Sequence, residues 1–215
     1  MDLGMAKIEV MDSLHSFRMN IFVLSKNPKR AAKYHLDKHV IKMLLEACQL
    51  LYTAHWAFAF PELLKEKSAI ALSKAQKALP VPSCLSTAPH SKTRKEEPGF
   101  RPVHIHHPCA RWVRESTGNY LWTATLACAL ADEYEFRWPG RGSHQCAAHA
   151  QWLLEHLPPA LPEKPLEDFV QAMEDRFKDP NAIVAYRTYY KISKGEERGM
   201  LKYTKRDPPK FLSEE

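Results

Sequence analysis

The sequence predicts an all-α protein, a single-domain bundle of about seven helices with a short extended segment at its N-terminus. Three observations favour this class. The 215 residues include only 7 glycines, alanine, leucine, glutamate and lysine are abundant, and runs of β-branched residues are few. A hydrophobic content of 45% and a charged content of 26% are typical of a soluble globular domain that is large enough to bury a core.

Composition divides the chain into a central domain and two ends. Residues 1–18 have weak periodicity and are expected to be disordered or loosely attached. Residues 19–193 form the helical domain, and residues 194–215 form a basic, proline-bearing tail with partial order at most. A flexible insertion at about residues 80–107, rich in proline and serine, is either a lid or binding loop or an inert solvated segment. Its cations suited to phosphate contact are Lys92, Arg94, Lys95 and Arg101.

In the first half of the domain, start signals and apolar spacing define three helices. Residues 19–24 form the short extended segment, and a polar cap followed by proline then starts a short helix over residues 28–34. The main helix covers residues 37–58 and has an apolar arc so wide that we expect it to be buried on most sides. A peripheral, largely solvated helix follows over residues 61–79.

In the second half, Pro108 starts a helix that Gly118 and Asn119 break or kink. The stretch from residue 120 to 131 is nearly all apolar or small, which predicts a central buried helix that ends at Trp138. Ser143 is expected to cap the next helix.

Beyond that helix, residues 158–165 are a linker. Residues 165–178 carry apolar side chains at helical spacing, which predicts a helix with an ordinary core face. Asp179 and Pro180 then cap and begin the last helix, which ends near residue 193.

The net charge and the cysteine spacing limit which partners and which cellular compartment the sequence suits. The net charge of +6 and a pI near 9.0 permit a polyanionic partner such as nucleic acid without requiring one. The five cysteines form no C-x-x-C pair, which favours a reducing cytoplasm. No apolar run approaches the ~20 residues of a membrane span and no secretory signal is present, so no membrane partner is expected.

The main helix also carries a polar stripe opposite its apolar arc, made of His39, Lys42, Glu46, Gln49 and Thr53. A plain solvated face usually repeats lysine and glutamate, whereas this stripe mixes several residue types. The stripe is therefore either the one wet edge of the helix or the wall of a pocket.

The first candidate site lies on this stripe. His39, Lys42 and Glu46 share one helix face, and a carboxylate beside a histidine and a lysine supplies the tuned proton donor and acceptor that acid/base catalysis needs. The lysine could instead hold a phosphate or act as an amine nucleophile. The alternative is a buried salt-bridge network that ties helices together. The partners expected from the kinked middle helices are His107, Arg114 and Asn119.

A zinc site is a further alternative. His35 and His39 are four residues apart, so on one helix both imidazoles project to the same side. The H-L-D-K-H pattern lacks the glutamate of a metalloprotease helix. A third ligand would have to come from His104, His106, His107 or Cys109. Because no second ligand pair has a recognised spacing, no metal is assigned, and the sequence identifies no cofactor.

Two further groups of polar residues come from the later helices. Glu133 and Arg137 are one turn apart and could pair. Tyr186, Arg187 and Tyr190 lie in A-Y-R-T-Y-Y, where aromatic rings interleaved with cations could stack on bases and contact phosphates. The alternative is that the tyrosines pack in the core.

From residue 19 onward, the chain resembles a family of small proteins of tailed-bacteriophage genomes. It also has a looser likeness to phage enzymes of thymine hypermodification and base excision. The motifs that carry the resemblance are N-I-F-V-L at 20–24, D-K-H-V-I-K-M-L-L-E at 37–46, H-P-C-A-R-W-V-R-E-S-T-G-N-Y at 107–120, E-Y-E-F-R at 133–137, His144 and A-Y-R-T-Y-Y at 185–190. The long insertion and the Trp138-Pro-Gly-Arg-Gly turn depart from the family pattern.

The resemblance and the polar stripe together predict a phage-type enzyme that acts on a nucleotide or DNA base, through pyrimidine modification or excision by a transferase or glycosylase-like hydrolase. It would work in the cytoplasm, that of an infected bacterial host if the protein is viral. His39 and Glu46 would handle protons. Lys42, Arg114, Arg137 and Arg187 would neutralise phosphate, and Asn119, Tyr186 and Tyr190 would hold the base. Lys42 and His107 are also predicted to be catalytic, and Glu133 and His144 to bind the substrate.

Three other classes remain open at this stage. The first is a non-catalytic DNA- or RNA-binding protein that uses the basic tail and the insertion. The second is the zinc-binding helical protein described above, and the third is a phage protein that inhibits a host partner through an exposed apolar surface.

Overall fold

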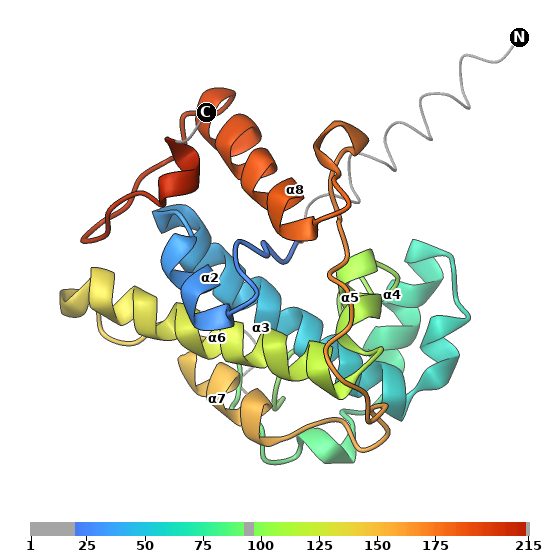
Figure 1. The fold of residues 1–215 in the computed structure, drawn as a ribbon. Helices are drawn as coiled ribbons and strands as arrows, with labels where there is room; N and C mark the ends of the chain where they lie inside the picture. The colour runs from blue at the N-terminus through green and yellow to red at the C-terminus, as the bar shows by residue number, and fades with distance from the viewer. Residues whose placement is uncertain (1–19, 93–96, 214–215) are drawn as a thin grey trace, which may run out of the picture.

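The structure is a computed structural model that describes residues 20–92 and 97–213 (Figure 1). The predicted extension over residues 1–18 lies outside the described residues. The described residues form seven α-helices and no strand, with one isolated bridge between His90 and Pro98, so the all-α prediction is confirmed. The helices are α2 (Pro28–Tyr34), α3 (Asp37–Ala59), α4 (Ala69–Ala78), α5 (Pro108–Val113), α6 (Thr117–Arg137), α7 (Ala147–Glu155) and α8 (Ala182–Tyr189).

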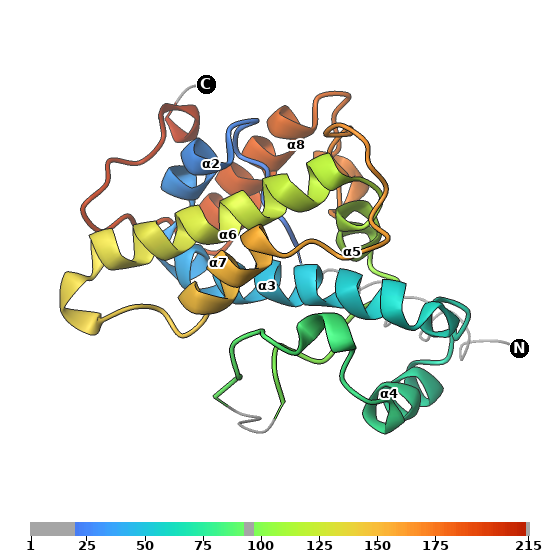
Figure 2. The same ribbon diagram turned by 90° about the horizontal axis from the view of Figure 1, so that it is seen from below.

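Helices α3 and α6 pack along each other and form the centre of the bundle, with α2 and α7 packed on α6 (Figure 2). Leu44 and Leu51 of α3 and Leu130 of α6 are completely buried. The wide apolar arc of α3 therefore has partners on several sides, as the sequence predicts. None of the described helices is both long and apolar enough to cross a membrane.

The segment ahead of α2 is short and non-helical, and it runs through the core. Ile21, Phe22, Val23 and Leu24 are all buried. Phe22 packs against the rings of three tyrosines of the C-terminal region. The Asn27 side chain accepts a hydrogen bond from the Arg30 N–H and Pro28 occupies the first turn, which starts α2 where the sequence places it.

Four predicted helix boundaries are wrong. The last helix, α8, is capped by Asn181 and begins at Ala182, not at Asp179 and Pro180. Residues 61–79 form a 3₁₀ turn over Pro61–Leu64 and then a separate α4, because Ser68 caps a new helix start. The break between α5 and α6 comes before Gly118, because Ser116 caps α6. The Ser143 hydroxyl donates to Glu135 instead of capping a helix, and α7 begins only after Cys146.

The predicted helix over residues 165–178 is also wrong, because only a 3₁₀ turn over Asp175–Phe177 is helical there. The chain runs past the start of α6 instead, where the Gly118 N–H donates to the Lys164 carbonyl. A Cβ on Gly118 would lie 2.1 Å from the Leu166 nitrogen, so glycine permits this close approach. Phe169 is still partly buried, packed against the rings of Trp112 and Trp122.

The insertion is packed against α3 where the structure describes it. The Phe100 carbonyl accepts a hydrogen bond from the Trp56 indole, and the Val103 N–H donates to the Thr53 hydroxyl. Arg101, proposed to contact phosphates, pairs with Glu97 at 2.7 Å instead. Of the other proposed phosphate contacts, Lys92 lines a pocket described below, and Arg94 and Lys95 lie outside the described residues.

The tail was expected to be ordered only in part, yet residues 197–213 pack against α2 and the start of α3 (Figure 1). The Tyr203 hydroxyl donates to the Tyr34 carbonyl at 3.1 Å. The Thr204 hydroxyl donates to the Asp37 carboxylate at 2.7 Å. These contacts anchor a segment whose own sequence carries no helical pattern.

Candidate active site

Lys42 and Glu46, one turn apart on α3, form the most promising chemical group on the polar stripe. The Lys42 Nζ lies 3.1 Å from Glu46 Oε1, and the Asn20 backbone N–H donates to Glu46 Oε2 at 3.1 Å. The Lys42 side chain is 60% exposed, whereas the Glu46 side chain is 8% exposed. A carboxylate that is nearly shielded from water therefore lies directly beneath an exposed ammonium group.

Burial raises the pKa of the Glu46 carboxyl above its ordinary 4.5. The neighbouring Lys42 ammonium, the Asn20 N–H and the more distant Lys194 ammonium oppose that shift because they favour the charged carboxylate. A carboxyl group with a raised pKa accepts and returns protons closer to neutral pH than a solvated one does. Glu46 is thus suited to general acid/base work.

Lys194 also belongs to this site, although nothing in the sequence connects it with Glu46. It belongs to a π-helical continuation of α8 over Tyr190–Glu196, a type of turn that is frequent at functional sites. Its side chain is buried, and its Nζ donates to the Tyr189 hydroxyl at 3.1 Å. The same Nζ lies 5.7 Å from the centre of the Phe22 ring. Sequence spacing gives no signal for a π turn. The sequence therefore places Lys194 only in a basic run that either contacts phosphates or is solvated.

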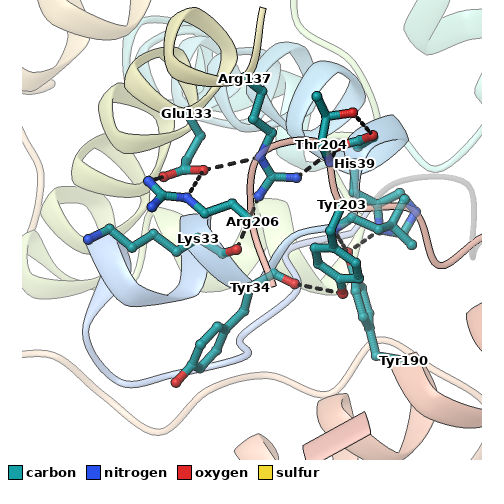
Figure 3. Close-up of polar contacts among 11 residues, drawn as sticks. Lys33, Tyr34, His39, Glu133, Arg137, Tyr190, Tyr203, Thr204 and Arg206 are labelled. Carbon is teal, nitrogen blue, oxygen red and sulfur yellow. Dashed lines mark hydrogen bonds and ion pairs between the residues drawn. The ribbon is translucent and has the colours of Figure 1, made fainter. Parts of the chain in front are cut away.

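His39 is buried beside this group and is held on two sides. Its ring stacks on Phe22 at a centroid distance of 4.5 Å. Its Nδ1 lies 2.7 Å from the Tyr190 hydroxyl, and Figure 3 shows both of these residues. Burial, and then the positive charges of His35 and Lys194, lower the pKa of His39 to about 2. The imidazole is therefore neutral near pH 7 and a weak base, so Glu46 fits the proton-transfer role better than His39 does.

The two tyrosines proposed to hold a base are completely buried. The Tyr186 hydroxyl lies 3.1 Å from Asn20 Oδ1 and 2.8 Å from the Val170 carbonyl. The Tyr190 hydroxyl accepts a hydrogen bond from the Leu36 N–H as well as contacting His39. Both rings thus fix the segment beside Glu46, which matches the alternative of core packing.

The predicted convergence of the stripe with two arginines is not found. Arg137 binds Asp37 at the first residue of α3, whereas Arg114 lines a pocket with Ala57 near the other end of that helix. At 1.5 Å per residue, these two points are about 30 Å apart along α3. Arg114 donates to the carbonyls of Ile105 and Ala110, so its guanidinium stabilises the chain around α5.

Arg137 is part of a buried ion network (Figure 3). Its guanidinium donates to Asp37 at 3.0 Å, to Glu133 at 3.1 Å and to the Lys33 carbonyl. Arg206 from the tail reaches the same Glu133 carboxylate at 2.6 Å. The predicted pairing of Glu133 with Arg137 is therefore confirmed, and both side chains are fully occupied within the protein.

The remaining proposed residues stabilise the chain locally. The Asn119 side chain bridges the Trp112 carbonyl and the Glu167 N–H. Nδ1 of His107 and Nδ1 of His144 each accept a hydrogen bond from the N–H two residues later in the chain. The Arg187 Nε donates to the Leu24 carbonyl at 3.1 Å, and its guanidinium lies 5.0 Å from the Phe211 ring centre.

The described residues do not form the zinc arrangement that the sequence permits. His35 ends α2 instead of sharing a helix with His39, and the two ring centres are 6.5 Å apart. Nδ1 of His35 lies 2.7 Å from the Ala31 carbonyl. Within residues 20–92 and 97–213, no three histidine, cysteine, aspartate or glutamate side chains lie close enough together to hold a metal ion.

Comparison of the chain with protein-family models, with curated proteins and with solved structures finds no match. The resemblance to a tailed-bacteriophage family therefore stays a prediction.

Proposed function

We propose that the protein is an enzyme that acts on a nucleotide or DNA base, with Glu46 as its acid/base residue. The observation that carries this proposal is the Glu46 carboxyl itself, which is buried, has a raised pKa and is paired with an exposed lysine. A purely structural ion pair on a helix surface gains little from such burial, because desolvation offsets most of the attraction.

The charges around Glu46 favour an anionic substrate. Lys42, Lys194 and Arg198 all lower the pKa of the nearby His39 by their positive charge. The whole chain carries a net charge of +6. Phosphate groups are the anions that such a cationic rim would hold, with Lys42 as the exposed contact.

Hydrolysis of an N-glycosidic bond is one reaction of this class in which a single carboxylate can take the role of the base. Glu46 would remove a proton from the attacking water while that water's oxygen bonds to the sugar C1′ and the base departs. The raised pKa lets the carboxyl return that proton to the departing base. The buried His39–Tyr190 pair would hold the Asn20–Phe22 segment in place beside Glu46.

Replacement of Glu46 by glutamine is expected to lower the rate of base release by roughly 10²- to 10⁴-fold, the usual contribution of a general acid or base. Glutamine keeps an acceptor for the Asn20 N–H, so the melting temperature should change little. The assay incubates the protein with thymidine nucleotides and with single- and double-stranded oligonucleotides that carry thymine, uracil or 5-hydroxymethyluracil. Free base is measured by mass spectrometry.

Glu62→Gln, at an exposed carboxylate after α3, is the matched control and should keep full activity. In the wild-type protein the rate should fall as the pH drops through the raised pKa of Glu46, which lies above 4.5. Equal rates for wild type and Glu46→Gln on a substrate that is turned over would refute the role of Glu46.

A further inference from the structure

Two cysteines meet on another side of α3, where Cys48 contacts Cys146 at the start of α7. The Cys48 thiol lies 3.9 Å from the Cys146 carbonyl oxygen. Cys48 is completely buried in the core. Cys146 is the residue immediately before α7, where the partial positive charge of the helix start favours a thiolate.

Cys146 also lines a pocket of about 360 Å³ that the insertion closes on one side. Gln49, Phe100 and His149 contribute to the same wall. Only 1% of the Cys146 residue surface is exposed, so a bulky reagent has little access. The pocket is large enough for small molecules, and Cys146 forms part of its wall.

The surroundings of the two sulfurs shift the pKa values of the two thiols in opposite directions. A hydrogen bond from the Cys48 thiol lowers the pKa of Cys146, and the His144 imidazole adds to this effect while burial opposes it. Burial raises the pKa of Cys48. Of the two thiols, the one at the pocket is therefore the more acidic.

We propose that Cys146 is a peroxide-reactive thiol, and that Cys48 resolves its oxidised form as a disulfide between α3 and α7. The substrate class is a small hydroperoxide, with hydrogen peroxide as the simplest member. The pocket that Cys146 lines would admit such a molecule, and the Cys48 thiol contacts the backbone of Cys146.

The chemistry balances in two steps. The Cys146 thiolate attacks one oxygen of hydrogen peroxide, the O–O bond breaks, and the departing hydroxide takes a proton to become water. The sulfur is thereby oxidised to a sulfenic acid. The Cys48 sulfur then attacks the Cys146 sulfur, the S–O bond breaks, and the hydroxyl leaves as water with the Cys48 proton. One peroxide oxidises two thiols to one disulfide and yields two waters.

The test treats the full-length protein with one equivalent of hydrogen peroxide, alkylates the remaining thiols under denaturing conditions, and maps the peptides by mass spectrometry. The expected product joins the peptides of Cys48 and Cys146, and the protein mass falls by two hydrogens. Cys84 and Cys128 should stay alkylatable, because burial raises the pKa of both. Cys128→Ser, the control variant, should form the disulfide as the wild type does.

The two variants of the pair separate the steps. Cys146→Ser should consume peroxide no faster than the background of the other thiols. Cys48→Ala should accumulate a sulfenic acid on Cys146 that dimedone traps. The proposal is overturned if Cys84 or Cys128 is oxidised while Cys146 stays free. A sulfinic acid on Cys146 of the wild-type protein beside a free Cys48 would likewise overturn the resolving role.

Discussion

Replacing Arg137 by methionine is expected to lower the free energy of unfolding by about 3–5 kcal/mol, the usual cost of removing one partner of a buried ion pair. The Arg137 side chain is fully buried between Asp37 and Glu133. Methionine fills much of the same volume but leaves both carboxylates short of a donor. Glu133 keeps Arg206, whereas Asp37 keeps only the hydroxyl and the N–H of Thr204.

The measurement is urea unfolding of the Arg137→Met protein against the wild type, followed by circular dichroism. Arg141→Met, one turn further along at an exposed position, should change the unfolding free energy by about 0.5 kcal/mol or less. Arg137→Lys is expected to recover only part of the loss, because lysine cannot bind both carboxylates and the Lys33 carbonyl with one planar group. If Arg137→Met were as stable as Arg141→Met, the network would have no structural role.

The second large effect is loss of stability in mild acid. Burial is the main cause that lowers the pKa of four histidines, to about 4 for His35, His55 and His149 and to about 2 for His39. In the unfolded chain these groups titrate near the ordinary 6.5. Between pH 6.5 and 4 the unfolded state therefore binds more protons, and the stability that is present above pH 6.5 is lost as the pH falls.

Within this window, each such histidine lowers the unfolding free energy by about 1.4 kcal/mol for each pH unit of acidification. The four histidines together therefore lower it by several kcal/mol between pH 6.5 and pH 5. Glu46 partly offsets this loss of stability. Because its pKa is raised in the folded state, the folded protein binds a proton there at a higher pH than the unfolded chain does. Urea unfolding at half-unit steps of pH measures the slope directly.

His149→Gln should reduce that slope by about one histidine, since glutamine can still pair with the Tyr52 hydroxyl without titrating. His106→Gln, at an exposed position, should leave the slope unchanged. A free energy of unfolding that does not change from pH 6.5 to pH 5 would contradict the burial of the four neutral imidazoles.

The parts of the fold that sequence predicts well are those that local signals determine. The Asn27–Pro28 start and the wide apolar arc of α3 require only neighbouring residues, and the bounds of both helices follow from them. Residues 165–178 show the limit of such signals. Apolar side chains at helical spacing also suit a non-helical chain whose Phe169 packs against two tryptophans.

The candidate site was predicted in part for the same reason. Lys42 and Glu46 share a helix face, so their contact follows from a spacing of four residues. The covering Asn20 and the buried Lys194 come from segments far away in the chain, and the π turn that places Lys194 has no known spacing rule. The predicted convergence of Arg114 and Arg137 is wrong because their positions depend on how α5 and α6, respectively, pack along a long α3.

The most direct test of the proposed site is an NMR titration of the labelled protein with a short single-stranded thymine oligonucleotide at low salt. The proposal predicts that the largest shift changes map to Lys42, Glu46 and Lys194, and that Lys42→Met weakens binding. Changes confined to the exposed tail lysines Lys202, Lys205 and Lys210, with the Glu46 region unmoved, would contradict it. That result would leave a nucleic-acid-binding protein without a site at Glu46.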